Sequence, residues 1–349
     1  METIWFCLVA VMIAMYVLLD GFDLGAGAIH FLVARTREER RQVIASIGPV
    51  WDGNEVWLLA AGGALYFAFP ALYASGFSGF YLPLMIVLWL LILRGTAVEF
   101  RNHLKSDVWI PLWDFVFFAA SALLAVFYGA ALGNVVRGVP LDASGYFFEP
   151  LWTNFRLGEQ TGILDWYTIV VGVQALIVLV MHGGLWVQYK TGGAVSERAA
   201  TVTKTAWWGV LVMTVLVTFV TFQVQPQVRE NFLTWPAGYI LPLLAIAGLA
   251  GVQFELRRKN QLNAFFASCA YILGMLTSVV FGVYPMVLPA RDRRFALDVH
   301  SAKAGAYGLK VGLVWWVIGM LLATIYFVYV YRAFAGKVVA NQEGHEAGD

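Results

Sequence analysis

The chain has 349 residues and a formal net charge of +1; 60% of its residues are hydrophobic and only 13% are charged. Soluble proteins average about half apolar and about a quarter charged residues, so this composition excludes a soluble protein, and disorder requires the opposite balance. The near-zero net charge, without a basic block, argues against a nucleic acid partner. Two cysteines far apart in apolar runs, Cys7 and Cys269, exclude a disulfide scaffold, a CxxC redox pair and a zinc ribbon.

Nine apolar runs have lengths suited to crossing a bilayer. About 20 mostly apolar residues cross about 30 Å of hydrocarbon as a helix, and no run shows the period-two alternation of a barrel strand. The sequence therefore predicts an all-α, polytopic transmembrane protein with about nine helices. They form one transmembrane domain over residues 1–336, followed by a polar tail over residues 337–349. The predicted spans are Ile4–Val33, Asn54–Phe69, Phe77–Leu93, Ile110–Leu132, Ile163–Val187, Trp207–Val224, Gly238–Phe254, Asn263–Leu288 and Gly312–Val330.

The distribution of lysine and arginine predicts the orientation. An odd number of spans puts the two ends on opposite sides, and the loops of one side carry 15 of the 23 Lys and Arg residues against 8 on the other. The positive-inside rule then places the N-terminus outside and the C-terminal tail in the cytoplasm. The last outer loop, Arg291–Lys310, is more basic than this rule predicts. The first span lacks a basic flank and a cleavage site, so we expect an uncleaved membrane helix.

The first span carries two acids, Asp20 and Asp23. Ionisable residues inside apolar spans are costly and are therefore the first candidates for function. Their i, i+3 spacing puts both carboxylates on one helix face, and Asp20 follows Ile4 by about 24 Å of helix, toward the cytoplasmic side. Gly21 and Gly25 form a small-xxx-small pair that lets another helix approach closely. The alternative is that the helix ends near Asp20 and the acids are solvated.

A second group of polar and aromatic residues opens the second span: Trp51, Asp52, Asn54, Glu55 and Trp57. Asp52 followed three residues later by Glu55 is a variant of the capping box, so a capping role is one interpretation. In the other, both acids face inward beside the acids of the first span, because a short basic loop makes the two helices antiparallel neighbours. A cluster of acids open to the cytoplasm suits proton uptake. Asp20, Asp23, Asp52 and Glu55 are thus the proton-transfer candidates.

Charged residues also follow the third span. Arg94, Glu99 and Arg101 are interpreted first as a positive-inside anchor with surface ion pairs, and together with Trp51 and Asn54 they are candidates for structural or interface contacts. Asp114, in the fourth span, is either interfacial or the partner of a buried base.

The histidines do not form a metal-binding pattern. Only His182 lies well within a span and His30 lies at the end of another, whereas a heme or metal site needs intramembrane histidines on facing helices or at HxxxH spacing. A lone intramembrane histidine is typical of a hydrogen-bonded structural residue or a proton relay. No catalytic residue or metal site is predicted in this chain.

Two long motifs carry a resemblance to a known family. The stretches Leu19–Gly25 and Gly48–Trp57 resemble the two signature stretches of subunit II of cytochrome bd-type quinol oxidases. The similarity covers nearly the whole chain and continues through Ala61–Ala64, Phe77–Tyr81, Glu99–Arg101, Gly133–Asn134, Gly138–Pro140, Tyr284–Pro285 and Tyr307–Lys310, with Arg94. The departures are the basic run Arg291–Arg294 and His300, which stands where an amide is expected.

The resemblance implies a role in a respiratory complex of the bacterial cytoplasmic membrane that oxidises quinol and reduces oxygen to water. Two b-type hemes and one d-type heme belong to the partner, subunit I, and this chain ligates none. In the family, the aspartate matching Asp52 is associated with proton delivery along the subunit interface, and the tryptophan matching Trp57 lies near the mouth of an apolar oxygen route. Further expected partners are small single-helix accessory subunits, membrane lipid and quinol.

Two other functions fit the sequence pattern. A proton- or sodium-coupled secondary transporter also places acids in glycine-interrupted helices, but near the bilayer midplane and repeated in both halves. Here the fifth span offers only His182 and, at its outer end, Asp165. The third hypothesis is a structural membrane scaffold in which the acids only cap helices and bind subunit I.

Overall fold

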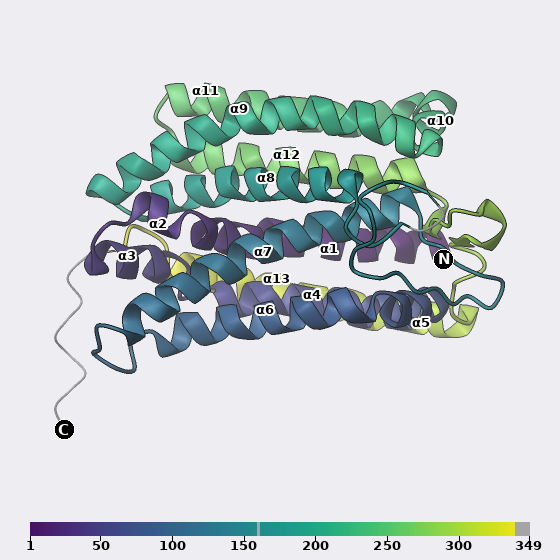
Figure 1. Ribbon diagram of the computed structural model, residues 1–349, viewed down its shortest axis with the longest axis horizontal. Helices are drawn as coiled ribbons and strands as arrows, with labels where there is room; N and C mark the ends of the chain where they lie inside the picture. Colours follow the sequence, from purple (N-terminus) through teal and green to yellow (C-terminus); the bar gives the residue numbers. More distant parts are fainter. Residues whose placement is uncertain (159–160, 339–349) are drawn as a thin grey trace.

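The computed structural model describes residues 1–158 and 161–338, and most of the predicted polar tail lies outside these residues. Long helices run side by side along the longest axis of the molecule (Figure 1). They are α1 (Glu2–Ala28), α4 (Trp51–Ala68), α6 (Tyr81–Phe100), α7 (Trp109–Arg137), α8 (Trp166–Lys190), α9 (Gly193–Val224), α11 (Ile240–Arg257), α12 (Gln261–Val283) and α13 (Ala306–Ala333).

Short elements join the long helices at the two ends of the bundle (Figure 1). They are α2 (His30–Val33), α3 (Arg37–Ile47), α5 (Pro70–Gly79), α10 (Pro226–Thr234), the 3-10 helices η1 (Pro236–Tyr239) and η2 (Arg293–Phe295), and the antiparallel strands β1 (Met286–Leu288) and β2 (Leu297–Asp298). The end that carries α2 and α3 is called the inner end, and the end that carries the N-terminus is called the outer end. The charge distribution predicts that the inner end faces the cytoplasm.

The all-α membrane fold is confirmed. Within the described residues, eight helices are long and apolar enough to cross a membrane, and they correspond to eight of the nine predicted spans. The remaining predicted span, Asn54–Phe69, lies in α4, which has 18 residues and a polar first turn that lowers its mean hydropathy. The helix α4 nevertheless runs along the bundle with its long neighbours (Figure 1).

Three predicted boundaries differ from the structure. The first span is interrupted at Ile29, after which His30–Val33 forms the separate turn α2. The helix of the second predicted span, α4, ends at Ala68 because Pro70 cannot continue it. Phe77–Gly79, predicted as the start of the third span, belongs to α5. The eighth span ends at Val283, since the chain then forms β1. Apolar composition alone did not distinguish these short elements from the ends of long helices.

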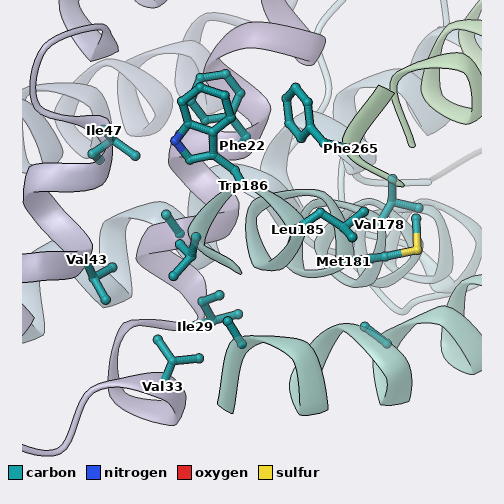
Figure 2. Packing of buried hydrophobic residues seen from close by; sticks show 14 of the residues in the cluster. Phe22, Ile29, Val33, Val43, Ile47, Val178, Met181, Leu185, Trp186 and Phe265 are labelled. Atoms are coloured by element: carbon teal, nitrogen blue, oxygen red, sulfur yellow. The ribbon is translucent and has the colours of Figure 1, made fainter. Parts of the chain in front are cut away.

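The centre of the bundle is the crossing of α1 and α8. A methyl group added at Gly25 would collide with the Leu179 carbonyl oxygen, and one added at Gly183 would collide with the α1 backbone. The glycines therefore let the two backbones touch, as the small-residue spacing in α1 predicts. Toward the inner end, Phe22 of α1 stacks on Trp186 of α8 at 4.1 Å between ring centroids (Figure 2).

The last helix, α13, lies at the periphery. None of the residues in its most apolar 18-residue window is buried, whereas 61% of those in the corresponding window of α8 are. At the outer end, the Trp5 indole N–H donates to the Leu309 carbonyl at 3.0 Å. At the inner end, Lys190 Nζ donates to the carbonyls of Phe334 and Gly336 at 2.7 and 2.8 Å. Hydrogen bonds at both ends therefore fix α13 to the outside of the bundle.

Candidate functional site

A buried arginine joins the first two groups of acids. Arg94 of α6 is 1% exposed, and its guanidinium donates to Asp20 Oδ1 of α1 at 2.6 Å and also to Glu55 of α4. The proximity of the acids on α1 and α4 at similar depth, predicted from the short loop between the two helices, is therefore observed for Asp20 and Glu55. The interpretation of Arg94 as a surface anchor is wrong, because three helices enclose its side chain.

An amide links the second acid of α1 to the same cluster. Asn54 Nδ2 donates to Asp23 Oδ2 at 2.8 Å and to the Leu19 carbonyl at 3.3 Å. The Tyr331 hydroxyl of α13 donates to Asn54 Oδ1 at 2.9 Å. Asp20 and Asp23 are both fully buried, so the alternative that they are solvated beyond the end of a helix is wrong. The side chain of Asn54 thus links α1, α4 and α13.

The charges of this inner acid cluster do not balance. Three carboxyl groups, Asp20, Asp23 and Glu55, face one guanidinium, and both aspartates are completely buried. Each aspartate also keeps one buried oxygen without a hydrogen-bond partner among the described residues, Asp20 Oδ2 and Asp23 Oδ1. Isolated charges are costly away from water, so a cluster with an excess of carboxyl groups is suited to hold protons. The free oxygens are the positions where a proton can bind.

The remaining candidates of the second motif point elsewhere. Asp52 is exposed, whereas Glu55 is half-buried and bonds to Arg94. The N-cap residue of α4 is Val50, and no side chain makes a cap hydrogen bond there, whereas capping boxes do occur at α3 and α8. The cap interpretation of Asp52 and Glu55 therefore has no hydrogen bond to support it. Trp51 is half-buried and its ring lies over Gly95.

Aromatic residues cover the inner acid cluster on its outer side. Trp57 is 7% exposed, packs with Met12, Tyr16 and Ala61, and has an indole nitrogen without a partner. One turn before Asp20 on α1, the Tyr16 hydroxyl donates to the Tyr128 hydroxyl of α7 at 2.8 Å. Neither tyrosine was a candidate from the sequence. The sequence signal that could have identified them is a tyrosine hydroxyl in the middle of an apolar span, because a buried hydroxyl needs a hydrogen-bond partner.

A second buried ionic network is centred on Asp114 at the inner end. Asp114 Oδ1 accepts from Arg101 Nε at 2.6 Å and lies 3.1 Å from His30 Nε2, so Asp114 is the partner of a buried base. Arg40 of α3 approaches the other oxygen at 3.5 Å. Arg101 therefore has a structural role. Glu99 is exposed and makes no side-chain ion pair within the described residues.

The two membrane-embedded histidines are engaged by protein groups. His182 Nδ1 lies 2.7 Å from Ser268 Oγ and Nε2 lies 2.9 Å from the Leu18 carbonyl, and the ring stacks on Phe265 at 4.8 Å. His30 uses one ring nitrogen for Asp114. In residues 1–158 and 161–338, no three His, Cys, Asp or Glu side chains converge as a metal site. Both ring nitrogens of His182 are thus occupied by protein groups, which leaves neither free for axial ligation of a heme.

The outer end holds a third ionic network. Arg137 of α7 pairs with Asp165 at the start of α8, and with Glu149 in the long loop at 2.9 Å; Arg291 also pairs with Glu149. Burial raises the pKa of Glu149 and lowers that of Arg291, because desolvation disfavours the charged form of each group, and their attraction opposes both shifts. Among the described residues, two cations thus match two anions in this outer ionic network.

The fold and these sites define a polytopic membrane subunit with a buried acid cluster near its inner end and no metal site of its own in the described residues. The family model of cytochrome bd terminal oxidase subunit II matches residues 1–334. The chain belongs to this family, so the resemblance inferred from the two motifs is confirmed.

Relatives and a solved structure agree with the family. Cytochrome bd ubiquinol oxidase subunit 2 of Bacillus subtilis is 30% identical over 98% of both chains. A probable cytochrome oxidase subunit 2 of Haemophilus influenzae is 31% identical over 97% of this chain and 95% of the relative. The structure of bd oxidase from Geobacillus thermodenitrificans has a TM-score of 0.75, with 16% identity, over 95% of this chain and 98% of that chain. These similarities support the oxidase over the transporter.

Proposed function

We propose that this chain is the heme-free subunit II of a bd-type terminal quinol oxidase in the bacterial cytoplasmic membrane. The observation that carries the proposal is the family match over residues 1–334. Its partner is the heme-bearing subunit I, which carries two b-type hemes and one d-type heme and oxidises quinol. The hemes supply the redox chemistry, and the residues of this chain supply support and a route for protons. Small accessory subunits and membrane lipid complete the proposed assembly.

The inner acid cluster is proposed as the proton route of this subunit. Reduction of oxygen to water consumes protons, and drawing them from the cytoplasm makes the reaction generate a membrane potential. The cluster lies near the inner end: Asp20 is about 27 Å along α1 from Glu2. Three carboxyl groups around one guanidinium accept and release protons without leaving an unpaired buried cation. Protons would move between Glu55, at the accessible edge, and the buried Asp20 and Asp23.

Asp52 is proposed to lie against subunit I. Its carboxylate is exposed on α4, where contact with lipid would be costly, so a polar partner is expected to cover it. Further along the same helix, Gly62 and Gly63 have open space where a side chain would stand, as on a surface prepared for another helix. The exposed helix α13 packs near α4 through Phe327, which contacts Trp57 at 5.6 Å between rings. Subunit I would cover α4 and α13.

The apolar cluster around Trp57 is the proposed oxygen route. Trp57, Met12, Ala61 and Phe327 form an apolar region directly beside the polar cluster, and oxygen partitions into such regions. The bulky indole would set the width of the passage.

Substitution of Asp52 tests the proton role against a scaffold role. Asp52→Asn keeps the size and capping ability of the side chain, since Asn ranks with Asp as an N-cap. If Asp52 transfers protons, Asp52→Asn and Asp52→Ala both assemble with slow turnover, and Asp52→Glu is partly active. The measurement is quinol-driven oxygen uptake per heme across a range of pH. Full activity of Asp52→Asn at every pH would contradict the proton role of Asp52.

Two measurements test the assembly and its orientation. A transporter would purify without the absorption band of a d-type heme, which the oxidase complex must show. The orientation of the chain in the membrane is tested by labelling of introduced cysteines. Cysteines placed at Glu39 and Gly145, in a chain without Cys7 and Cys269, are expected to be labelled from opposite sides of the membrane. Labelling of both from outside intact cells would contradict the predicted topology.

A further inference from the structure

A pocket at the outer end is lined by three arginines. It has a volume of about 160 Å³ and lies between the start of α10 and the segment that contains β1 and η2. Its polar lining consists of Arg137, Arg291, Arg293, Gln225 and Gln227, and no acidic side chain of the described residues lines it. One water occupies about 30 Å³ of liquid, so this outer arginine pocket has room for a group the size of phosphate.

The charge around the outer arginine pocket is not balanced. Arg137 and Arg291 share the carboxylates of Glu149 and Asp165, which lie behind them and do not line the pocket. Arg293 is exposed, and its side chain makes no ion pair or hydrogen bond with the described residues. Gln225 and Gln227 stand at the start of α10, where helix N–H groups also favour an anion. Among the described residues, the charge of Arg293 therefore has no acidic partner at the pocket.

Exposed aromatic residues beside α10 indicate that the pocket lies at the depth of the lipid headgroups. Just after α10, Trp235 and Tyr239 are 68% and 46% exposed, as in the aromatic belt of a membrane interface. The helix α10 buries Val228 and Phe232 across the ends of its neighbours. Arg291 and Arg293 belong to the basic run that violates the positive-inside rule and departs from the family pattern. An anionic group bound at the outer interface would explain why this run is basic.

We propose that the outer arginine pocket binds one phosphate group, either that of an outer-leaflet phospholipid or free inorganic phosphate. Arginine suits this role because its planar guanidinium donates two parallel hydrogen bonds to phosphate oxygens. Arg293 would supply the charge that recognises the anion, and Arg291 and Arg137 would be held in place by the carboxylates behind them. The site is independent of the proton route at the opposite end of the bundle.

The test compares the intact, purified oxidase complex with two variants. Arg293→Gln removes the uncompensated charge from an exposed side chain. Arg294→Gln is the matched control, because Arg294 is an exposed neighbour that pairs with Asp292 and does not line the pocket. Each complex is stripped with detergent, and retained phospholipid is counted by native mass spectrometry. Phosphatidylglycerol micelles and inorganic phosphate are then titrated separately, with the thermal midpoint as readout.

A lipid site predicts that the wild type and Arg294→Gln retain one phospholipid more than Arg293→Gln. Phosphatidylglycerol would then raise the thermal midpoint of Arg293→Gln only at concentrations about tenfold higher, since a charge-assisted hydrogen bond is lost. A free-phosphate site predicts the same tenfold difference with inorganic phosphate and no difference in retained lipid. Arg293→Lys, which keeps the charge, is expected to lie between the two. Equal behaviour of Arg293→Gln and the wild type with both probes would overturn the proposal.

Discussion

The inner acid cluster and the outer ionic network use the same residue types with opposite balance. In the outer network, Arg137 and Arg291 face Glu149 and Asp165, and Asp165 also accepts from the Tyr167 and Thr168 N–H groups of α8. In the inner cluster, Arg94 pairs with Asp20 and Glu55, and Asp23 bonds to Asn54 instead of a cation. Two carboxyl oxygens and Arg94 Nε have no partner among the described residues. A saturated network fixes one structure, whereas an unsaturated one leaves positions where protons can bind and leave.

The largest effect is expected from Arg94→Gln. Removing the guanidinium leaves the carboxyl groups of the inner acid cluster without a counter-charge. Loss of one partner of a buried ion pair lowers the free energy of unfolding by about 3–5 kcal/mol. We expect little assembled complex, measured as heme per unit of membrane protein. In the double variant Arg94→Gln/Asp20→Asn, part of the yield should return because one carboxyl group is neutral. Normal heme content in the single variant would show that the cluster is not held together by charge.

A smaller effect is expected from Arg137→Gln in the outer ionic network. Glu149 keeps Arg291 and Asp165 keeps two backbone donors, so the loss is that of charged hydrogen bonds, about 2–3 kcal/mol. The thermal midpoint should fall while oxygen uptake per heme stays at the wild-type value. A parallel fall of oxygen uptake per heme would mean that the outer ionic network takes part in turnover and is not purely structural.

The smallest effect on stability is expected from Asp20→Asn. An amide keeps the shape and a hydrogen bond to Arg94 and lowers the excess of acids, so the thermal midpoint should change little. Oxygen uptake per heme should nevertheless fall at least about tenfold, because an amide cannot carry a proton. The matched variant Asp165→Asn, in the outer network, should show the reverse pattern: a lower thermal midpoint and normal uptake. Wild-type uptake in Asp20→Asn would exclude Asp20 from the proton route.

Depth along a helix was predictable from this sequence, and rotation about its axis was not. Counting residues placed Asp20 and Glu55 at matching depth, and the structure joins both to Arg94. The helices are apolar on nearly every side, so no polar face indicates which way a side chain points. For this reason the sequence left open whether Asp52 caps a helix or faces inward, and it is exposed; Arg94 was interpreted first as a surface anchor and is buried.

Contacts between distant segments were beyond the sequence pattern. The pairing of Asp114 with Arg101 and His30 was left open because the two partners lie on different elements. The bond from Tyr331 to Asn54 joins residues 277 positions apart and had no signal in either span. Breaks at Ile29 and Phe80 were missed because hydropathy does not register a single turn outside the helical conformation. The long motifs, in contrast, were sufficient to identify the family.

The peripheral position of α13 has a consequence for synthesis. This helix is made after the other spans, and it carries the hydroxyl that completes the hydrogen bonds of Asn54, which in turn holds Asp23. Until α13 has been inserted, Lys190 also lacks its two carbonyl acceptors, and the Trp5 indole lacks its one. A nascent chain therefore holds an unfinished acid cluster until α13 has been inserted and packed against α4.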